Sequence, residues 1–208
     1  QEKCRGRVIH YGPRLGVGVV LDGTNLDAAL PALAWDVALW EQRACSSPRV
    51  LFVEDADGSG TLPRTIGERL NAALEQVRGT LPPRSLTLDE KAEVLSFREL
   101  AWWSGSATVH APAGSMSHTV LVVPSIPADI PLGARTVLVV PLRDAAKLPE
   151  VLRPLRDYLQ TAVLAAPPER WLTGVNALID SGLSQVTAPG AASARVMGLP
   201  HEGEYALR

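Results

Sequence analysis

The sequence predicts an α/β fold in which a mostly parallel sheet lies between two layers of helices. Short Val-rich segments alternate along the chain with amphipathic helical patterns. Turns rich in Gly, Pro and Asp connect each expected strand to the neighbouring helix. The segment RTVLVVPL at 135–142 is continuously apolar at its centre, which is typical of a strand buried on both faces. With 208 residues, the chain can form one domain with a sizeable core.

The first half of the pattern begins with a strand over 15–21. Asn25 caps a helix over 26–43, whose apolar face is broadened by Trp35, Leu39 and Trp40, and a strand follows over 49–54. Gly16 and Gly18 lie inside the first strand, without the third glycine that a phosphate-binding turn places at the start of a helix. We therefore expect them to allow close approach of another part of the chain.

Two helices follow, over 61–79 and 87–103, and we expect them to form a hairpin on one face of the sheet. Thr87 and Glu90 have the spacing of a capping box, and Trp102 and Trp103 are expected to pack into the core. The remaining predictions are strands over 108–110, 119–123, 135–142, 161–165 and 184–187, a helix over 148–158 interrupted at Pro154, and a helix opened by Pro167 and Pro168 and ended by Gly182.

Composition excludes several classes of function. The formal net charge of −2 gives no basic surplus for a nucleic-acid surface. No apolar run approaches the roughly 20 residues of a membrane span, and no signal sequence is visible, so we expect a cytoplasmic protein. Only Cys4 and Cys45 occur, and the four histidines are scattered, so neither a disulfide framework nor a metal site is predicted.

Cys45 lies in a short turn rich in Ser and Pro, between the expected helix and the expected strand. A thiolate is a strong nucleophile, and such a turn can hold it in a cleft with backbone N–H groups nearby. The N–H of Cys45 or Ser46 is placed to bind an oxyanion, although Ser46 and Ser47 also suit a purely structural turn. Without further signals, a single cysteine is more often a buried core residue.

The residues around Cys45 resemble a known catalytic segment. Gln42, Ala44 and the run from Cys45 to Pro48, followed by an apolar strand ending in Glu54, are similar to the catalytic-cysteine segment of the bacterial-luminescence type of fatty acyl-CoA reductase. That family is a branch of the aldehyde dehydrogenase superfamily. The resemblance continues in order along nearly the whole chain, as HYGPRLGVGVVLD, RTVLVVPL, RDYLQTAVLAA and GLPHEGEYAL.

This resemblance implies an aldehyde-dehydrogenase-like catalytic domain and a two-step reduction. Cys45 would take a long-chain acyl group from acyl-CoA or an acyl-protein, and NADPH would reduce the resulting thioester to a fatty aldehyde. Gln42, Ser46 and Ser47 are candidates for the oxyanion site or the turn, and His201 for the mouth of the site. Residues 1–208 would form one catalytic domain, a fragment without its N-terminal dinucleotide-binding domain, and the subunits would associate with one another.

The sequence departs from the superfamily pattern at two positions, which bear on the type of reaction and on the cofactor contacts. The region around Tyr11 to Leu15 lacks the acid that activates water in hydrolytic aldehyde dehydrogenases, which argues against oxidation of an aldehyde to an acid. The segment ADIPLGA at 128–134 lacks the glutamate that holds the cofactor ribose, so cofactor contacts stay unassigned.

Two other readings remain open at the level of sequence. The chain could be a non-catalytic interaction module in which Cys45 is a core residue. It could also be another thiol enzyme, such as an acyltransferase or a Cys-His hydrolase, with His118 or His201 as the base. A structural role is the stronger expectation for His118.

Overall fold

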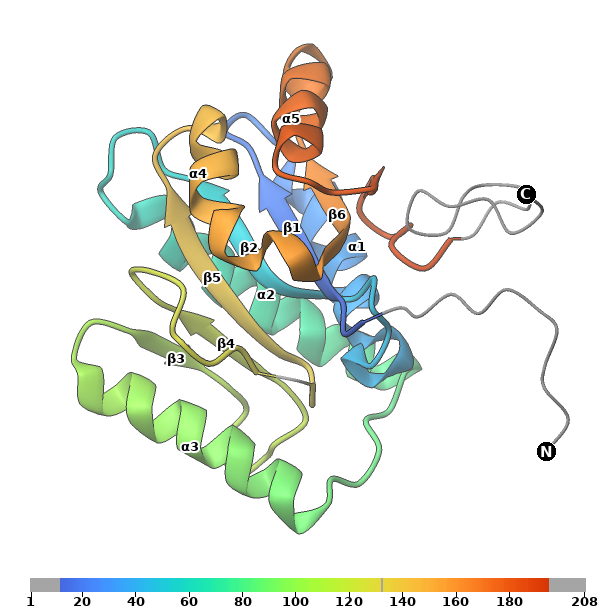
Figure 1. Cartoon of the computed structure of the whole chain (residues 1–208). Coiled ribbons are helices and arrows are strands. Elements are labelled where there is room, and N and C mark those ends of the chain that lie inside the picture. Colours follow the sequence, from blue (N-terminus) through green and yellow to red (C-terminus); the bar gives the residue numbers. More distant parts are fainter. Residues whose placement is uncertain (1–11, 132, 195–208) are drawn as a thin grey trace, which may run out of the picture.

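The computed structural model describes residues 12–131 and 133–194, which form a seven-stranded sheet in the order β3-β4-β5-β2-β1-β6-β7 (Figure 1). Every neighbouring pair is parallel except β3 and β4. The strands are β1 (Leu15–Val20), β2 (Pro48–Glu54), β3 (Thr108–His110), β4 (Thr119–Val122), β5 (Thr136–Leu142), β6 (Leu159–Ala165) and β7 (Gln185–Thr187). This confirms the predicted α/β class with a mostly parallel sheet.

Helices cover both faces of the sheet (Figure 1). The α-helices are α1 (Leu26–Ala38), α2 (Thr61–Thr80), α3 (Leu88–Ser104), α4 (Leu148–Leu152) and α5 (Pro168–Asp180), and the 3-10 helices are η1 (Leu39–Gln42), η2 (Ala145–Lys147) and η3 (Arg153–Tyr158). Helices α1 and α2 pack on one face, and α3, α4 and α5 on the other. The expected hairpin of α2 and α3 is therefore wrong, because the non-helical segment 81–87, with Pro82 and Pro83, carries the chain to the opposite face.

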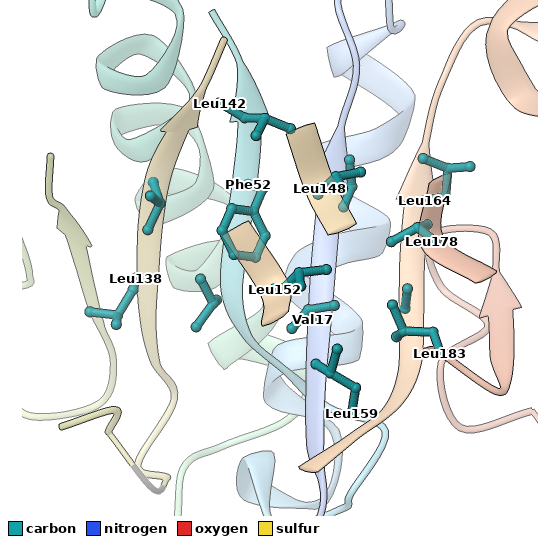
Figure 2. Packing of buried hydrophobic residues seen from close by; sticks show 14 of the residues in the cluster. Val17, Phe52, Leu138, Leu142, Leu148, Leu152, Leu159, Leu164, Leu178 and Leu183 are labelled. Carbon is teal, nitrogen blue, oxygen red and sulfur yellow. The ribbon is translucent and has the colours of Figure 1, made fainter. Parts of the chain in front are cut away.

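The central strands are buried on both faces because successive side chains enter opposite helix layers. Figure 2 shows Val17 and Phe52 on the face that packs against Leu148 and Leu152 of α4. The intervening residues, such as Val20 and Val53, join α1 and α2 in a second cluster. Both predicted caps are present: Asn25 Oδ1 accepts from the N–H groups of Asp27 and Ala28, and Thr87 and Glu90 form the capping box.

The tryptophan predictions are wrong in three places. Helix α1 ends at Ala38, five residues before the expected end, because the backbone turns left-handed at the next turn; Trp40 is consequently 66% exposed. Trp102 and Trp103 are 67% and 75% exposed and lie outside the core. Their indole rings pack against each other instead, in a T-shaped pair with centroids 4.9 Å apart.

Two titratable groups are buried on the face of the sheet that α1 and α2 cover. The carboxylate of Asp36 accepts hydrogen bonds from the N–H groups of Gly190 (2.7 Å) and Ala192 (3.1 Å), but burial dominates and raises the pKa of Asp36 to about 6. Burial lowers the pKa of His118 to about 4, opposed by the nearby charge of Glu75. The folded protein therefore keeps Asp36 protonated and His118 neutral at about pH 5.

These two groups have opposite effects on stability between about pH 4 and pH 6. Asp36 stabilises the fold below its unfolded pKa of 3.8, and this contribution is lost as the pH rises through about 6. His118 stabilises the fold above its unfolded pKa of 6.5, and this contribution is lost as the pH falls through about 4. We expect the slope of unfolding free energy against pH to be steeper in Asp36→Asn than in the wild type by about 1.4 kcal/mol per pH unit in this window. Urea unfolding at several pH values measures the slopes, and parallel curves would contradict the assignment of Asp36.

Candidate functional site

The turn that carries Cys45 lies at the amino ends of the central parallel strands. It joins η1 to the start of β2, and parallel strands begin at the same edge of a sheet, so it lies near the starts of β1, β5 and β6. Cys45 carries a reduced thiol of intermediate exposure. It lines a cleft of about 1330 Å³ between α3 and the sheet edge.

The cleft has a mainly apolar lining. Its sheet side includes Leu15, Leu121 and Leu138, and its α3 side includes Phe97 and Ala101. Charged side chains also line it, namely Arg14, Arg43, Arg49, Glu93 and Asp129. A concave apolar surface with a few polar groups is the usual form of a small-molecule site.

Arg49 is a cleft residue that sequence reasoning missed. Its side chain is buried, and Nη1 donates to the carbonyl of Pro131 at 3.2 Å. Burial lowers the pKa of Arg49, and the negative charge of Glu93 opposes this effect. Nothing in the local sequence around residue 49 indicates a contact more than eighty residues away, so only the fold reveals this tie across the cleft.

Backbone hydrogen bonds and two buried serines form the Cys45 turn. The N–H of Arg43 donates to Trp40 O (3.0 Å), and the N–H of Ser47 donates to Ala44 O (3.1 Å). Ser46 and Ser47 are both buried, and Ser46 Oγ lies 3.4 Å from Ser193 Oγ. Ser47 Oγ has no hydrogen-bond partner within the described part of the chain.

The absence of a side chain at Gly16 allows the backbone of Ser46 and Ser47 to pack directly against β1. A Cβ at this position would lie 2.6 Å from Ser47 O and 2.8 Å from both C and O of Ser46, closer than real Cβ contacts allow. The predicted close approach is therefore confirmed at Gly16. A Cβ at Gly18 would lie 2.6 Å from Cδ1 of the Leu51 side chain.

We expect Gly16→Ala to displace the Ser46–Ser47 backbone and to destabilise the protein. The added methyl group must move main-chain atoms, so we expect a loss of about 1–3 kcal/mol, or a Tm lower by roughly 2–10 °C. Gly79→Ala is the matched control, since a Cβ there meets nothing within 4 Å and alanine favours the helix. Thermal unfolding of both variants tests this, and equal Tm values for the two would contradict a tight contact at Gly16.

The side chain of Gln42 links the Cys45 turn to the beginning of β5. Its Nε2 donates to Pro48 O (2.9 Å) and to Thr136 O (2.8 Å), and its Oε1 accepts from the N–H of Thr136 (2.9 Å). Beside it, Glu41 forms an ion pair with Arg135. The sequence pointed to Gln42 through its position before Cys45, whereas Thr136 and Arg135 carry no local signal because they lie 94 residues away.

Of the two histidines considered as possible bases, His118 lies in the described part of the chain. His118 Nε2 lies 3.1 Å from Asn71 Oδ1, and His118 Nδ1 lies 3.2 Å from Ser117 Oγ. Both ring nitrogens are thus engaged beside α2, on the face of the sheet opposite α3, which agrees with a structural role. His201 lies outside the described residues.

The glycines of β1 pack against other parts of the protein and do not form a phosphate-binding turn. A Cβ on Gly16 would meet Ser46 and Ser47, and a Cβ on Gly18 would meet Leu51. Over residues 12–131 and 133–194, no group of three His, Cys, Asp or Glu side chains is placed to hold a metal ion. No helix in these ranges is long and apolar enough to span a membrane.

Solved structures with the same fold are aldehyde dehydrogenases. The NADP-dependent glyceraldehyde-3-phosphate dehydrogenase from Bacillus halodurans C-125 matches with a TM-score of 0.69 and 15% identity over 91% of this chain and 40% of its own. The methylmalonate-semialdehyde dehydrogenase from Oceanimonas doudoroffii gives a TM-score of 0.65 and 12% identity over 90% and 41%. The salicylaldehyde dehydrogenase from Pseudomonas putida G7 gives 0.61 and 15% over 93% and 42%.

The chain therefore spans about two fifths of the length of these dehydrogenases and shares their fold. A search of curated proteins finds no match. The family model described as acyl-CoA reductase (LuxC) matches residues 1–208, the entire sequence. With its parallel sheet and its cysteine turn at the strand starts, the chain belongs to the LuxC acyl-CoA reductase family.

Proposed function

We propose that this chain is the cysteine-bearing catalytic domain of a long-chain fatty acyl-CoA reductase, and that Cys45 is its nucleophile. The observation that carries the proposal is the position of the thiol, which is partly exposed and lines a large, mainly apolar cleft. A cysteine that only packs a core would be enclosed by apolar side chains. The family match supplies the substrate class.

In the proposed first step, the sulfur of Cys45 attacks the carbonyl carbon of an acyl-CoA. The Cys45 thiol first loses its proton to water; a carbon–sulfur bond then forms to Cys45, the bond to the CoA sulfur breaks, and CoA leaves as a thiolate that takes up one proton from the solvent, so that no net proton is gained or lost. The backbone N–H of Cys45 or Ser46 would bind the oxyanion, while the N–H of Ser47 already donates to Ala44 O. The acyl group would then be held as a thioester on the protein.

We propose that the second half of the reaction also uses a cofactor site formed outside residues 12–131 and 133–194. NADPH, when bound, supplies the hydride that turns the thioester into an aldehyde. The described residues contribute the cleft beside Cys45, and a dinucleotide-binding domain outside residues 1–208 would hold the cofactor phosphates. The share of the dehydrogenase structures that this chain covers supports this division.

Release of CoA in the absence of cofactor tests the proposal. The chain is mixed with palmitoyl-CoA, and free CoA is measured with a thiol reagent after the protein has been removed. We expect a burst of about one CoA per chain that then stops, because without NADPH the thioester on Cys45 is not reduced and the thiol is not regenerated. Continued release with formation of free fatty acid would indicate a thiol hydrolase. No release at all would indicate a non-catalytic module and would overturn the proposal for this chain.

A further inference from the structure

Three consecutive residues other than glycine hold a left-handed backbone just before the Cys45 turn. The φ angles are +58° at Trp40, +54° at Glu41 and +58° at Gln42. Side chains with a Cβ rarely adopt this conformation, and it persists only where the surroundings fix it. The segment that precedes β5 has the same feature, with φ of +54° at Ala134 and +52° at Arg135.

The two left-handed segments are bound to each other by buried side chains. Gln42 is 0% exposed, and its amide makes two hydrogen bonds to the backbone of Thr136 and one to Pro48 O. Arg135 is 2% exposed; it pairs with Glu41, and its Nη1 donates to Leu81 O at 2.8 Å. An unfavourable backbone conformation is thus held in place by hydrogen bonds and an ion pair from side chains on both sides.

Cys45 lies between the two points that this amide fixes, Gln42 itself and Pro48. We infer that Gln42 is a positioning residue, which sets the Cys45 turn against the beginning of β5 so that the sulfur faces the cleft. Both amide N–H groups of Gln42 already donate to carbonyl oxygens, so the side chain acts through the backbone and not on the acyl oxygen. The inference rests on the proposed acylation of Cys45 for its functional readout.

The test compares two reactions of Cys45, namely acyl transfer from palmitoyl-CoA, which depends on the orientation of the sulfur, and alkylation by iodoacetamide, which does not. Gln42→Met keeps the volume of the side chain and removes its three hydrogen bonds. Acyl transfer requires the sulfur to be aligned with the acyl carbon, so we expect the maximal rate of CoA release from palmitoyl-CoA to fall about 100-fold, with little change in the half-saturating concentration. Iodoacetamide is small and approaches from many directions, so we expect its rate of reaction with Cys45 to stay within about threefold of the wild type.

A control variant and a rescue separate positioning from general loss of stability. Glu54→Gln alters a buried polar group at the opposite end of β2, and we expect it to keep both rates when each protein is assayed at the same interval below its own Tm. In Gln42→Glu, a protonated carboxyl can donate one hydrogen bond to a carbonyl, whereas a carboxylate can donate none. Its acylation rate relative to the wild type should therefore rise as the pH falls from 8 to 5.5.

The outcomes distinguish this inference from the proposed function. Wild-type acylation rates in Gln42→Met, or an equal loss of acylation in Glu54→Gln, would overturn the role of Gln42. If the wild-type chain reacts with iodoacetamide at Cys45 but never releases CoA, the proposed function fails. In that case the Tm of Gln42→Met decides, and an unchanged Tm would also overturn the positioning role, since three buried hydrogen bonds that hold the turn cannot be removed without a loss of stability.

Discussion

Cys45→Ser is expected to abolish acyl transfer to the chain while leaving the fold intact. A serine hydroxyl is not ionised near neutral pH, so it lacks the nucleophilicity of a thiolate. We expect the rate of CoA release to fall by roughly 10³-fold or more, the scale seen when a covalent nucleophile is removed. The partial exposure of Cys45 predicts a small effect on stability, with the Tm within a few degrees of the wild type.

The other cysteine provides the control for this experiment. Cys4→Ser changes the same atom type at a position that lies outside the described residues, and we expect it to acylate at the wild-type rate. Persistence of the CoA burst in Cys45→Ser, together with its loss in Cys4→Ser, would move the nucleophile to Cys4 and overturn the proposed site.

Glu54→Ala is expected to cause the largest loss of stability of the changes considered. Glu54 is 4% exposed at the carboxyl end of β2, where it accepts from the N–H groups of Asp22 (2.9 Å) and Ala145 (3.2 Å) and forms a bidentate ion pair with Arg170. Its removal leaves the N–H groups of Asp22 and Ala145 and the guanidinium without this partner. Loss of one member of a buried pair costs about 3–5 kcal/mol, and we expect the lower end because the Arg170 side chain is 34% exposed.

Thermal and urea unfolding measure this effect, which should appear as a Tm lower by roughly 6–12 °C. The paired Arg170 and the two backbone donors lower the pKa of Glu54 against the opposing effect of burial. The stabilisation by Glu54 is therefore present above its unfolded pKa of 4.5 and lost as the pH falls. We expect the difference in stability between wild type and Glu54→Ala to shrink in acid. A difference that is already near zero at pH 7 would contradict this role.

The location of the site follows a rule different from the usual one for open parallel sheets. Ligands in such folds generally bind beyond the carboxyl ends of the strands. In this chain that end of β2 holds Glu54 and its structural contacts, whereas Cys45 precedes β2 at the amino end. Fold class alone would thus direct attention to the edge of the sheet opposite Cys45. The residues around Cys45 direct attention to the amino end instead, because nucleophile chemistry depends on residue type and turn.

Features set by local patterns could be predicted from the sequence. The buried strand at 135–142 has a continuous apolar centre, and the caps at Asn25 and Thr87 depend on side chains two or three residues from their partners. Gly16 was recognised as a point of close approach because glycine weakens a strand unless its lack of a side chain serves a purpose.

Features set by contacts between distant segments could not be predicted. The helical pattern of α1 continues beyond Ala38, and nothing in it shows that the buried amide of Gln42 would bind Thr136 and hold residues 40–42 left-handed. Trp102 and Trp103, at the end of α3, are of a residue type that usually packs in a core. They are exposed because no other segment of the described chain covers them, which the local sequence does not show. The change of sheet face between α2 and α3 similarly depends on how 81–87 crosses the edge of the sheet.

Peptide mapping by mass spectrometry tests the role of Cys45 most directly. The chain is incubated with palmitoyl-CoA in the absence of NADPH, digested with a protease at mildly acidic pH to preserve thioesters, and searched for peptides that carry a palmitoyl group. A palmitoyl thioester on Cys45, removed by hydroxylamine and missing in Cys45→Ser, is the predicted result. A palmitoyl group on any other residue, or no acylated peptide from a chain that is folded and saturated with donor, would contradict Cys45 as the nucleophile.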